Sequence, residues 1–176
     1  MKQLLLICAV VALVGCGKKE DGNTGVVNPN KPSPKAIPEK LITNPIIEKA
    51  VRAAIEKPEG ELTETDYEKV TELFLDRKQL TDVPKTDVPK GLEKLTQLKF
   101  LHLTNNQLTD VKGLEKLTNL ERLYLQGNKL TDVKGLENLT QLKSLLLYDN
   151  PALTKAQIDE LQKALPKCRI KHNAKP

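Results

Sequence analysis

The sequence predicts an α/β solenoid, in which short parallel strands form one concave sheet and helical segments cap both ends of the stack. The main observation is an internal repeat, because the windows that begin at Leu98, Leu120 and Leu142 align with a constant spacing of 22 residues. Residues 45–69 and 154–165 flank the repeats and show helical spacing of apolar residues. The 176 residues are too few for two ordinary enzyme domains, so we expect one solenoid with extensions.

Each repeat is expected to form one short strand with one buried face. Leu101 and Leu103 alternate with Phe100, His102 and Thr104, which is the period of two typical of such a strand. The returning half of the repeat supplies further apolar residues to the same interior, at Leu98, Leu108, Leu114 and Leu117. One repeat cannot bury these leucines, but stacked repeats bury them together. Because every coil turns the same way, the strands must be parallel.

The windows LKFLHLTNNQLTDVKGLEKLTN and LERLYLQGNKLTDVKGLENLTQ follow the pattern LxxLxLxxNxL. This pattern resembles leucine-rich repeat proteins, and the second halves TDVKGLxxLxxL are similar to the internalin-like bacterial class. The resemblance implies about four repeats at residues 70–153, after a helical N-terminal cap at 45–69 and before a C-terminal cap and tail at 154–176. It also implies that the concave face binds a protein or peptide, whose identity the sequence leaves open.

Asn106, Asn128 and Asn150 occupy the Asn position of the motif. A side-chain amide both donates and accepts hydrogen bonds, so we expect these residues to form a structural ladder that satisfies backbone groups in the turn after each strand. Lys78 stands at this position in the first repeat, so that turn needs another solution.

The first repeat is also longer than the others, since Val70 and Leu98 are 28 residues apart. It contains the sequence TDVPK twice, at 81–85 and 86–90. We expect a loop on the convex side or at an edge. A specificity loop is one interpretation, but a tolerated duplication is favoured.

The N-terminal cap is expected to begin at Asn44 and Pro45, which suit a helix N-cap and first turn. Ile47 and Val51 begin an apolar stripe, and Pro58 and Gly60 end the segment. Thr63 and Asp66 suggest a second short helix that runs through Tyr67 and Lys69.

The C-terminal cap is expected to combine a helix with a strand. Thr154 and Gln157 form a capping-box pattern, and Pro166 ends the helix. Cys168 and Ile170 alternate as in a final short strand. We interpret Cys168 as a buried packing residue rather than a reactive thiol.

The N-terminus predicts export. Residues 1–16 read MKQLLLICAVVALVGC, an apolar stretch after Lys2 that is too short to span a bilayer. Its end, LVGC, resembles the bacterial lipobox, which implies that the signal peptide 1–15 is removed and that Cys16 is acylated, with palmitate among its chains. An ordinary secretory signal with a chance Cys is the alternative. We expect a lipid-anchored protein of the cell envelope. By resemblance to known lipoprotein sorting signals, in which Asp after the Cys retains a protein in the inner membrane, Gly17 favours the outer membrane or cell surface.

Residues 16–44 are expected to be a flexible linker after the lipidated Cys16, because they hold four of the eleven prolines and no aromatic residue. Cys8 would leave with the signal peptide and Cys16 would carry lipid. Cys168 would then be the last free thiol, so we expect no intrachain disulfide.

The concave face is the candidate binding site. Its three outward columns hold four of the five aromatic residues of the chain, since the sequence has three Tyr, two Phe and no Trp. The candidate residues are Phe74, Phe100, His102, Arg122, Tyr124, Leu146 and Tyr148. Cross-strand packing of aromatic residues is the alternative explanation. Four strands would give a face about 15–20 Å wide, near the lower limit for a specific protein interface.

Other chemistry has few candidates. The net charge of +5 is spread along the chain, which argues against a nucleic-acid ligand. With two His and no metal-ligand cluster, phosphate loop or nucleophile motif, we expect no enzyme, metal or cofactor. Asp110 and Asp132 recur with the repeat and indicate structural turns. We expect a monomer. A binding module is favoured, and a structural envelope lipoprotein and a carbohydrate-binding adhesin remain alternatives.

Overall fold

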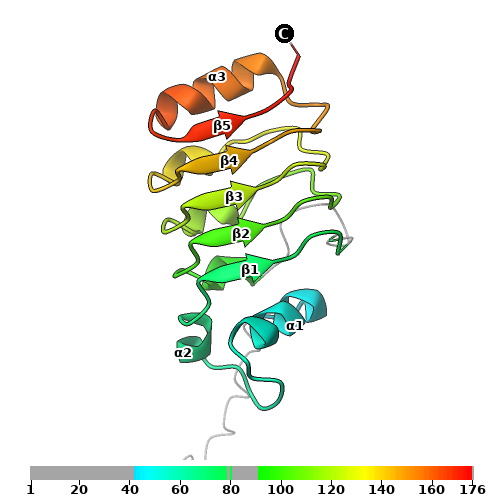
Figure 1. Cartoon of the computed structure of the whole chain (residues 1–176), viewed down its shortest axis with the longest axis vertical. Helices are drawn as coiled ribbons and strands as arrows, with labels where there is room; N and C mark the ends of the chain where they lie inside the picture. Colours follow the sequence, from blue (N-terminus) through cyan, green and yellow to red (C-terminus); the bar gives the residue numbers. More distant parts are fainter. Residues whose placement is uncertain (1–41, 79, 81–90, 176) are drawn as a thin grey trace, which may run out of the picture. The chain divides into compact units, whose positions relative to one another are not determined.

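The computed structural model of this chain describes residues 42–78, 80 and 91–175. They form the predicted α/β solenoid, with one parallel sheet and helical segments at both ends (Figure 1). The signal peptide 1–15, Cys16, most of the linker 16–44 and both TDVPK copies lie outside the described residues.

The sheet has five strands in sequence order, and each strand is parallel to the next. They are β1 (Glu72–Phe74), β2 (Phe100–His102), β3 (Arg122–Tyr124), β4 (Ser144–Leu146) and β5 (Arg169–Lys171). The first four are the repeat strands. The fifth comes from the C-terminal cap and extends the sheet, so its outer face is one strand wider than the repeats alone predict.

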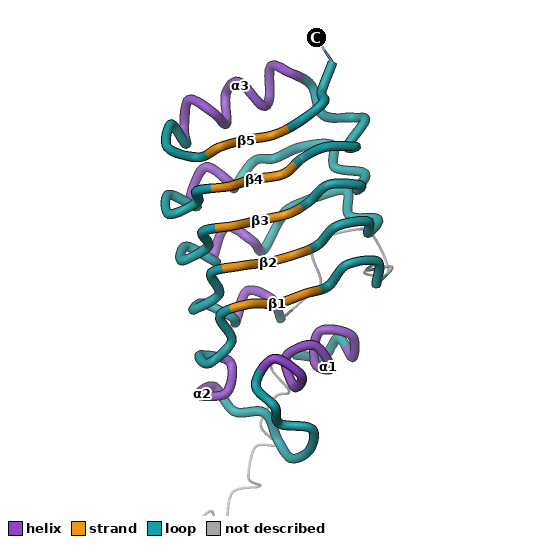
Figure 2. Tube along the Cα trace, in the orientation of Figure 1, coloured by secondary structure: helices purple, strands orange, loops and turns teal. Residues whose placement is uncertain are grey.

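Short 3-10 helices lie in the returning halves, behind the strands (Figure 2). They are η1 (Leu92–Lys94), η2 (Leu114–Lys116) and η3 (Leu136–Asn138). A glycine in the left-handed region precedes each, with φ of 94° at Gly113 and 96° at Gly135. Only Gly adopts this backbone conformation without a steric penalty, which explains the recurring Gly-Leu of the repeat.

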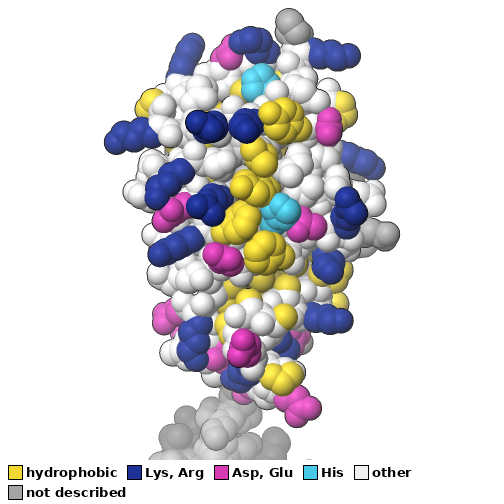
Figure 3. Space-filling view, in the orientation of Figure 1, with side chains coloured by type: hydrophobic (Ala, Val, Ile, Leu, Met, Phe, Trp, Pro, Cys, Tyr) yellow, Lys and Arg dark blue, Asp and Glu magenta, His cyan; other side chains and the backbone are white. Residues whose placement is uncertain are grey.

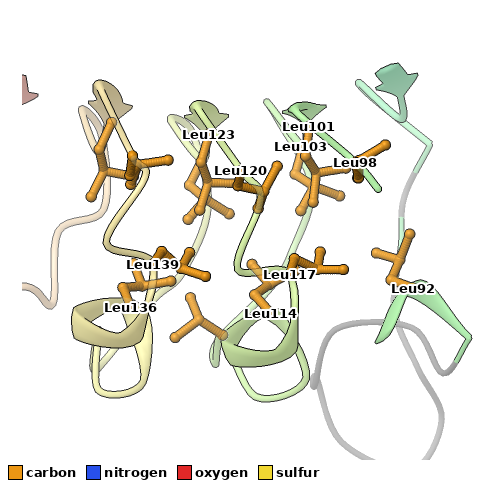
Figure 4. Packing of buried hydrophobic residues seen from close by; sticks show 14 of the residues in the cluster. Leu92, Leu98, Leu101, Leu103, Leu114, Leu117, Leu120, Leu123, Leu136 and Leu139 are labelled. Atoms are coloured by element: carbon orange, nitrogen blue, oxygen red, sulfur yellow. The ribbon is translucent and has the colours of Figure 1, made fainter. Parts of the chain in front are cut away.

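The core is a column of leucines between the strands and the 3-10 helices (Figure 4). Leu101 and Leu123 of the strands and Leu114 and Leu136 of the returning halves belong to this core, and all four are completely buried. Burying a leucine side chain contributes about 1.5–3 kcal/mol. No single repeat encloses its own leucines, so the stack as a whole supplies this stabilisation.

The buried asparagines connect successive turns. Asn128 donates to the carbonyl oxygens of Leu125, in its own repeat, and of Leu103, one repeat earlier, at 2.9 and 3.0 Å. Its Oδ1 accepts from the N–H of Leu108 at 3.1 Å. Asn150 makes the same contacts one repeat later. Each asparagine therefore satisfies its own turn and the preceding one.

This direction explains why the first repeat tolerates Lys78. Asn106 reaches back into that repeat, donating to the carbonyl of Leu75 at 2.9 Å and accepting from the N–H groups of Lys78 and Leu80. The first turn therefore needs no asparagine of its own, because the second repeat supplies the amide.

The N-terminal cap contains α1 (Pro45–Ala54) and α2 (Glu64–Tyr67). Asn44 caps α1 by accepting from the N–H of Ile46 at 2.9 Å, and Ile47 and Val51 are buried in the core. The second helix is shorter than predicted, since it ends at Tyr67 and the chain turns before Val70 enters the interior.

The C-terminal cap contains α3 (Lys155–Ala164), followed by β5. Thr154 and Gln157 form the predicted capping box, and Ile158 and Leu161 are buried. Cys168 is buried as well, with 4% of its surface exposed, and it begins the approach to β5. The two ends of the leucine column are thus covered by helical segments.

Candidate functional site

The surface of the sheet that faces away from the leucine core is the candidate site, and we call it the sheet face. Hydrophobic side chains form a column on this face, with Lys and Arg on both sides (Figure 3). The parallel register aligns its outward residues in columns. One column runs from Glu72 through Phe100, Arg122 and Ser144 to Arg169, and the next runs from Phe74 through His102, Tyr124 and Leu146 to Lys171.

Four rings of these columns contact one another and form what we call the ring cluster, which consists of Phe74, Phe100, His102 and Tyr124. The ring centroids of Phe100 and Tyr124 are 5.0 Å apart, and those of His102 and Tyr124 are 4.9 Å apart. Phe74 lies 5.5 Å from Phe100. All pairs are edge-to-face, the geometry that aromatic quadrupoles favour.

The ring cluster is partly open to solvent. Phe74 keeps 55% of its surface exposed, and Tyr148, at the other end of the face, keeps 38%. These two are the exposed large hydrophobic side chains among the described residues. Cross-strand contacts account for part of the aromatic clustering, but they do not remove Phe74 from water. Exposed aromatic surface of this kind is typical of binding surfaces.

His102 is held by polar contacts at the edge of the ring cluster. Its Nδ1 contacts the Asp76 carboxylate, whose other oxygen accepts from the N–H of Thr104 at 3.1 Å. In the described part of the chain, no group of three or more His, Cys, Asp or Glu side chains could hold a metal ion. The contact with Asp76 holds the imidazole of His102 beside the rings of Phe100 and Tyr124.

The C-terminal end of the sheet face is basic, and the sequence analysis missed part of it. Arg169 and Lys171 of β5 extend the columns of Arg122 and Tyr124. They were overlooked because β5 follows β4 by 25 residues rather than 22. Their alternation with the apolar Cys168 and Ile170 was the signal that could have identified them.

Asp110 and Asp132 lie in turns, as their periodicity indicated. The Oδ1 of Asp110 accepts from the N–H groups of Val111 and Lys112 at 2.6 and 2.8 Å, and Asp132 repeats this arrangement. Burial by itself would raise the pKa of Asp110, but its hydrogen bonds with Lys112 and Val111 lower the pKa overall. Both carboxylates are thus occupied by backbone groups.

A pocket of about 410 Å³ lies away from the sheet face, between α3 and the turn that leads into η3. Most of its polar lining groups already have partners in the protein. Asp132 and Glu137 accept backbone N–H groups, and the side chain of Gln157 caps α3 and donates to the carbonyl of Thr131. We therefore assign the pocket to the packing of the cap on the last repeat.

Comparison with known proteins gives a consistent result for the fold. A family model described as leucine-rich repeats, in two copies, matches residues 118–163. No protein among the curated sequences matches this chain.

Several solved structures share the fold. An internalin (InlF) from Listeria monocytogenes is 22% identical with a TM-score of 0.62, over 77% of this chain and 44% of that one. Internalin C2 from the same organism is 21% identical with a TM-score of 0.56, over 77% and 66%. The functional domain of InlJ, also from Listeria monocytogenes and described as including a cysteine ladder, is 28% identical with a TM-score of 0.61, over 76% and 27%.

The chain thus spans less than half of the InlF structure that it matches. The repeat pattern, the parallel sheet and these likenesses agree with one another. The described part of the chain has the fold of a leucine-rich repeat solenoid, similar to that of the internalin structures.

Proposed function

We propose that this protein is a membrane-anchored binding scaffold of the cell envelope, which recognises a protein ligand through the sheet face. The observation that carries the proposal is the ring cluster, because it places contacting aromatic side chains on a partly exposed surface of a rigid sheet. Aromatic residues surrounded by polar ones are the usual composition of a protein interface. Leucine-rich repeat solenoids offer such a face as a scaffold, and its exposed residues set the ligand.

Anchoring through Cys16 is part of the proposal, and the LVGC motif behind an apolar segment supports it. Acyl chains contribute about 0.8 kcal/mol per buried methylene, so several chains hold a protein on a bilayer durably. In the described residues, no helix is long and apolar enough to cross a membrane. The scaffold acts without enzymatic activity in this proposal, because Asp76 and His102 of the sheet face contact each other and the carboxylates of Asp110 and Asp132 accept backbone N–H groups.

The test of ligand binding is a crosslinking pull-down from envelope extract with the full chain. The wild type is compared with a Phe100→Ala/Tyr124→Ala variant, and Lys94→Ala/Lys116→Ala, in η1 and η2, is the matched control. We expect the wild type and the control to capture one partner protein that the ring variant loses. Capture of the same partner by the ring variant would move the site to the caps or the first repeat. Retention on polysaccharide columns without any protein partner would favour the adhesin interpretation.

The test of anchoring is a Cys16→Ser variant expressed in a bacterium that is fed labelled palmitate. We expect the wild type to carry label and to enter the membrane fraction, and the variant to do neither. An unlabelled wild type, or a variant that still carries label, would contradict lipidation at Cys16. If the protein is instead a structural lipoprotein without a ligand, deletion of its gene causes envelope defects. The Phe100→Ala/Tyr124→Ala variant then corrects these defects as well as the wild type does.

A further inference from the structure

The sheet face carries an asymmetric distribution of charge. At the β1 end, the carboxylate of Asp76 is occupied by His102 and by the N–H of Thr104. At the other end, Arg122, Arg169 and Lys171 are exposed. In the described part of the chain, no carboxylate lies within ion-pair distance of these three cations.

The register places these cations in a compact group. Arg122 and Arg169 lie in one column, two strand spacings apart, with the small side chain of Ser144 between them. Two spacings correspond to about 10 Å. Lys171 lies in the adjacent column, next to Leu146. Carboxylates therefore have room between two guanidinium groups, which bind them in a bidentate manner.

We propose that the ligand of the sheet face is an acidic protein segment. Its aliphatic or aromatic side chains cover the ring cluster, and its Asp or Glu side chains contact Arg122, Arg169 and Lys171. This inference rests on the proposed binding function and adds the chemical class of the partner. The ring cluster is centred near β2 and the cations near β4, about 10 Å apart. An extended chain covers about 3.3 Å per residue, so apolar and acidic residues of the ligand are about three residues apart.

The charge of the sheet face favours an acidic protein segment over other molecules that could bind there. A second copy facing the first in the same direction would bring the same three cations against them. A copy in the opposite direction would offer Glu72 as the one exposed carboxylate of the two columns. Residues 17–44 of this chain hold five lysines and three acidic residues, so they carry the same sign of charge as the basic end. A lipid headgroup would satisfy the cations but would leave the aromatic side chains of the ring cluster uncovered. An anionic glycan would contact both, so the test below includes a sulfated polysaccharide.

The test is the selection of peptides from a random displayed library by the immobilised full chain. Wild type is compared with Arg169→Gln/Lys171→Gln, which removes two cations of the face, and with the ring variant Phe100→Ala/Tyr124→Ala. The matched control Lys116→Gln/Lys163→Gln removes two exposed lysines from η2 and α3. We expect wild type and control to select peptides in which Asp and Glu are at least twofold enriched about three positions from an apolar residue. The charge variant is expected to lose that enrichment and to bind a selected peptide about tenfold more weakly.

Each other outcome contradicts a defined part of the argument. Selected peptides that are neutral or basic, or acidic enrichment that persists in the charge variant, would overturn the acidic ligand and leave protein binding intact. If the wild type selects only peptides that the ring variant also selects, the proposed function itself is contradicted. A third outcome is that wild type and ring variant bind dextran sulfate equally and bind no peptide at similar strength. The ligand would then be a general polyanion rather than an acidic protein segment.

Discussion

At the residue scale, the buried asparagines stabilise the solenoid by satisfying backbone groups that water cannot reach. We predict that Asn128→Ala lowers the free energy of unfolding by roughly 2–4 kcal/mol. The substitution removes the hydrogen-bond partner of one buried backbone N–H group and of two backbone carbonyl groups. Urea unfolding followed by far-UV circular dichroism measures the change. Asn138→Ala, at an exposed position of η3, is the control, and an equal effect there would contradict the ladder.

Cys168 offers a second test at this scale. Burial raises the pKa of its thiol from 9.0 to about 11, so the folded protein holds this proton more tightly than the unfolded chain. The contribution of Cys168 to stability is therefore constant below pH 9 and declines as the pH rises towards 11. In a Cys8→Ser/Cys16→Ser background, we predict slow labelling of native Cys168 by a thiol reagent at pH 8 and fast labelling in urea. Fast native labelling would show an accessible, reactive thiol.

At the scale of elements, the N-terminal cap is held by a buried carboxylate. The Lys57 ammonium, 2.6 Å from Asp66, together with the N–H and hydroxyl of Thr63, holds the pKa of Asp66 well below its usual range. Because the pKa of Asp66 is lower in the folded than in the unfolded protein, the ionised carboxylate stabilises the fold. This stabilisation is present above about pH 4 and is lost as the pH falls further. It links the loop after α1 to the start of α2.

We predict that Asp66→Asn reduces stability at pH 7 and makes the stability less dependent on pH between 4 and 2. Thermal unfolding at several pH values measures both effects. Glu64→Gln, at an exposed position of the same helix, is the control and should leave the pH dependence unchanged. An unchanged acid dependence in Asp66→Asn would show that other carboxylates control the acid unfolding of the cap.

At the scale of the whole molecule, the solenoid depends on its caps because each repeat is enclosed only by its neighbours. Removal of residues 154–176 would uncover Leu145 and Leu147, which are almost fully buried against the C-terminal cap. We predict that this truncation abolishes cooperative thermal unfolding and increases the binding of a hydrophobic dye. The point variant Lys163→Gln, on the surface of α3, should behave as wild type. Cooperative unfolding of the truncated chain would show that four repeats are stable without this cap.

The fold could be predicted from the sequence because the repeat is exact where the core is built. A constant spacing of Leu98, Leu120 and Leu142 fixes which side chains point inward, and one strand per repeat follows from the alternation around Leu101. The aromatic positions of the face follow from the same alternation. Their role as a binding site stays a prediction, because it depends on a ligand.

The sequence by itself determined the solenoid, its parallel strands, its buried leucines and its two caps, because these depend on short-range periodicity of apolar residues. The tertiary structure alone decided how Asn106 serves the turn at Lys78, how Asp76 meets His102, and in which register Arg169 and Lys171 join the sheet face. These contacts join residues 25 to 28 positions apart, across the long first repeat or the irregular step into the cap. Periodicity ends at such places, so only the packing of the stack brings these groups together.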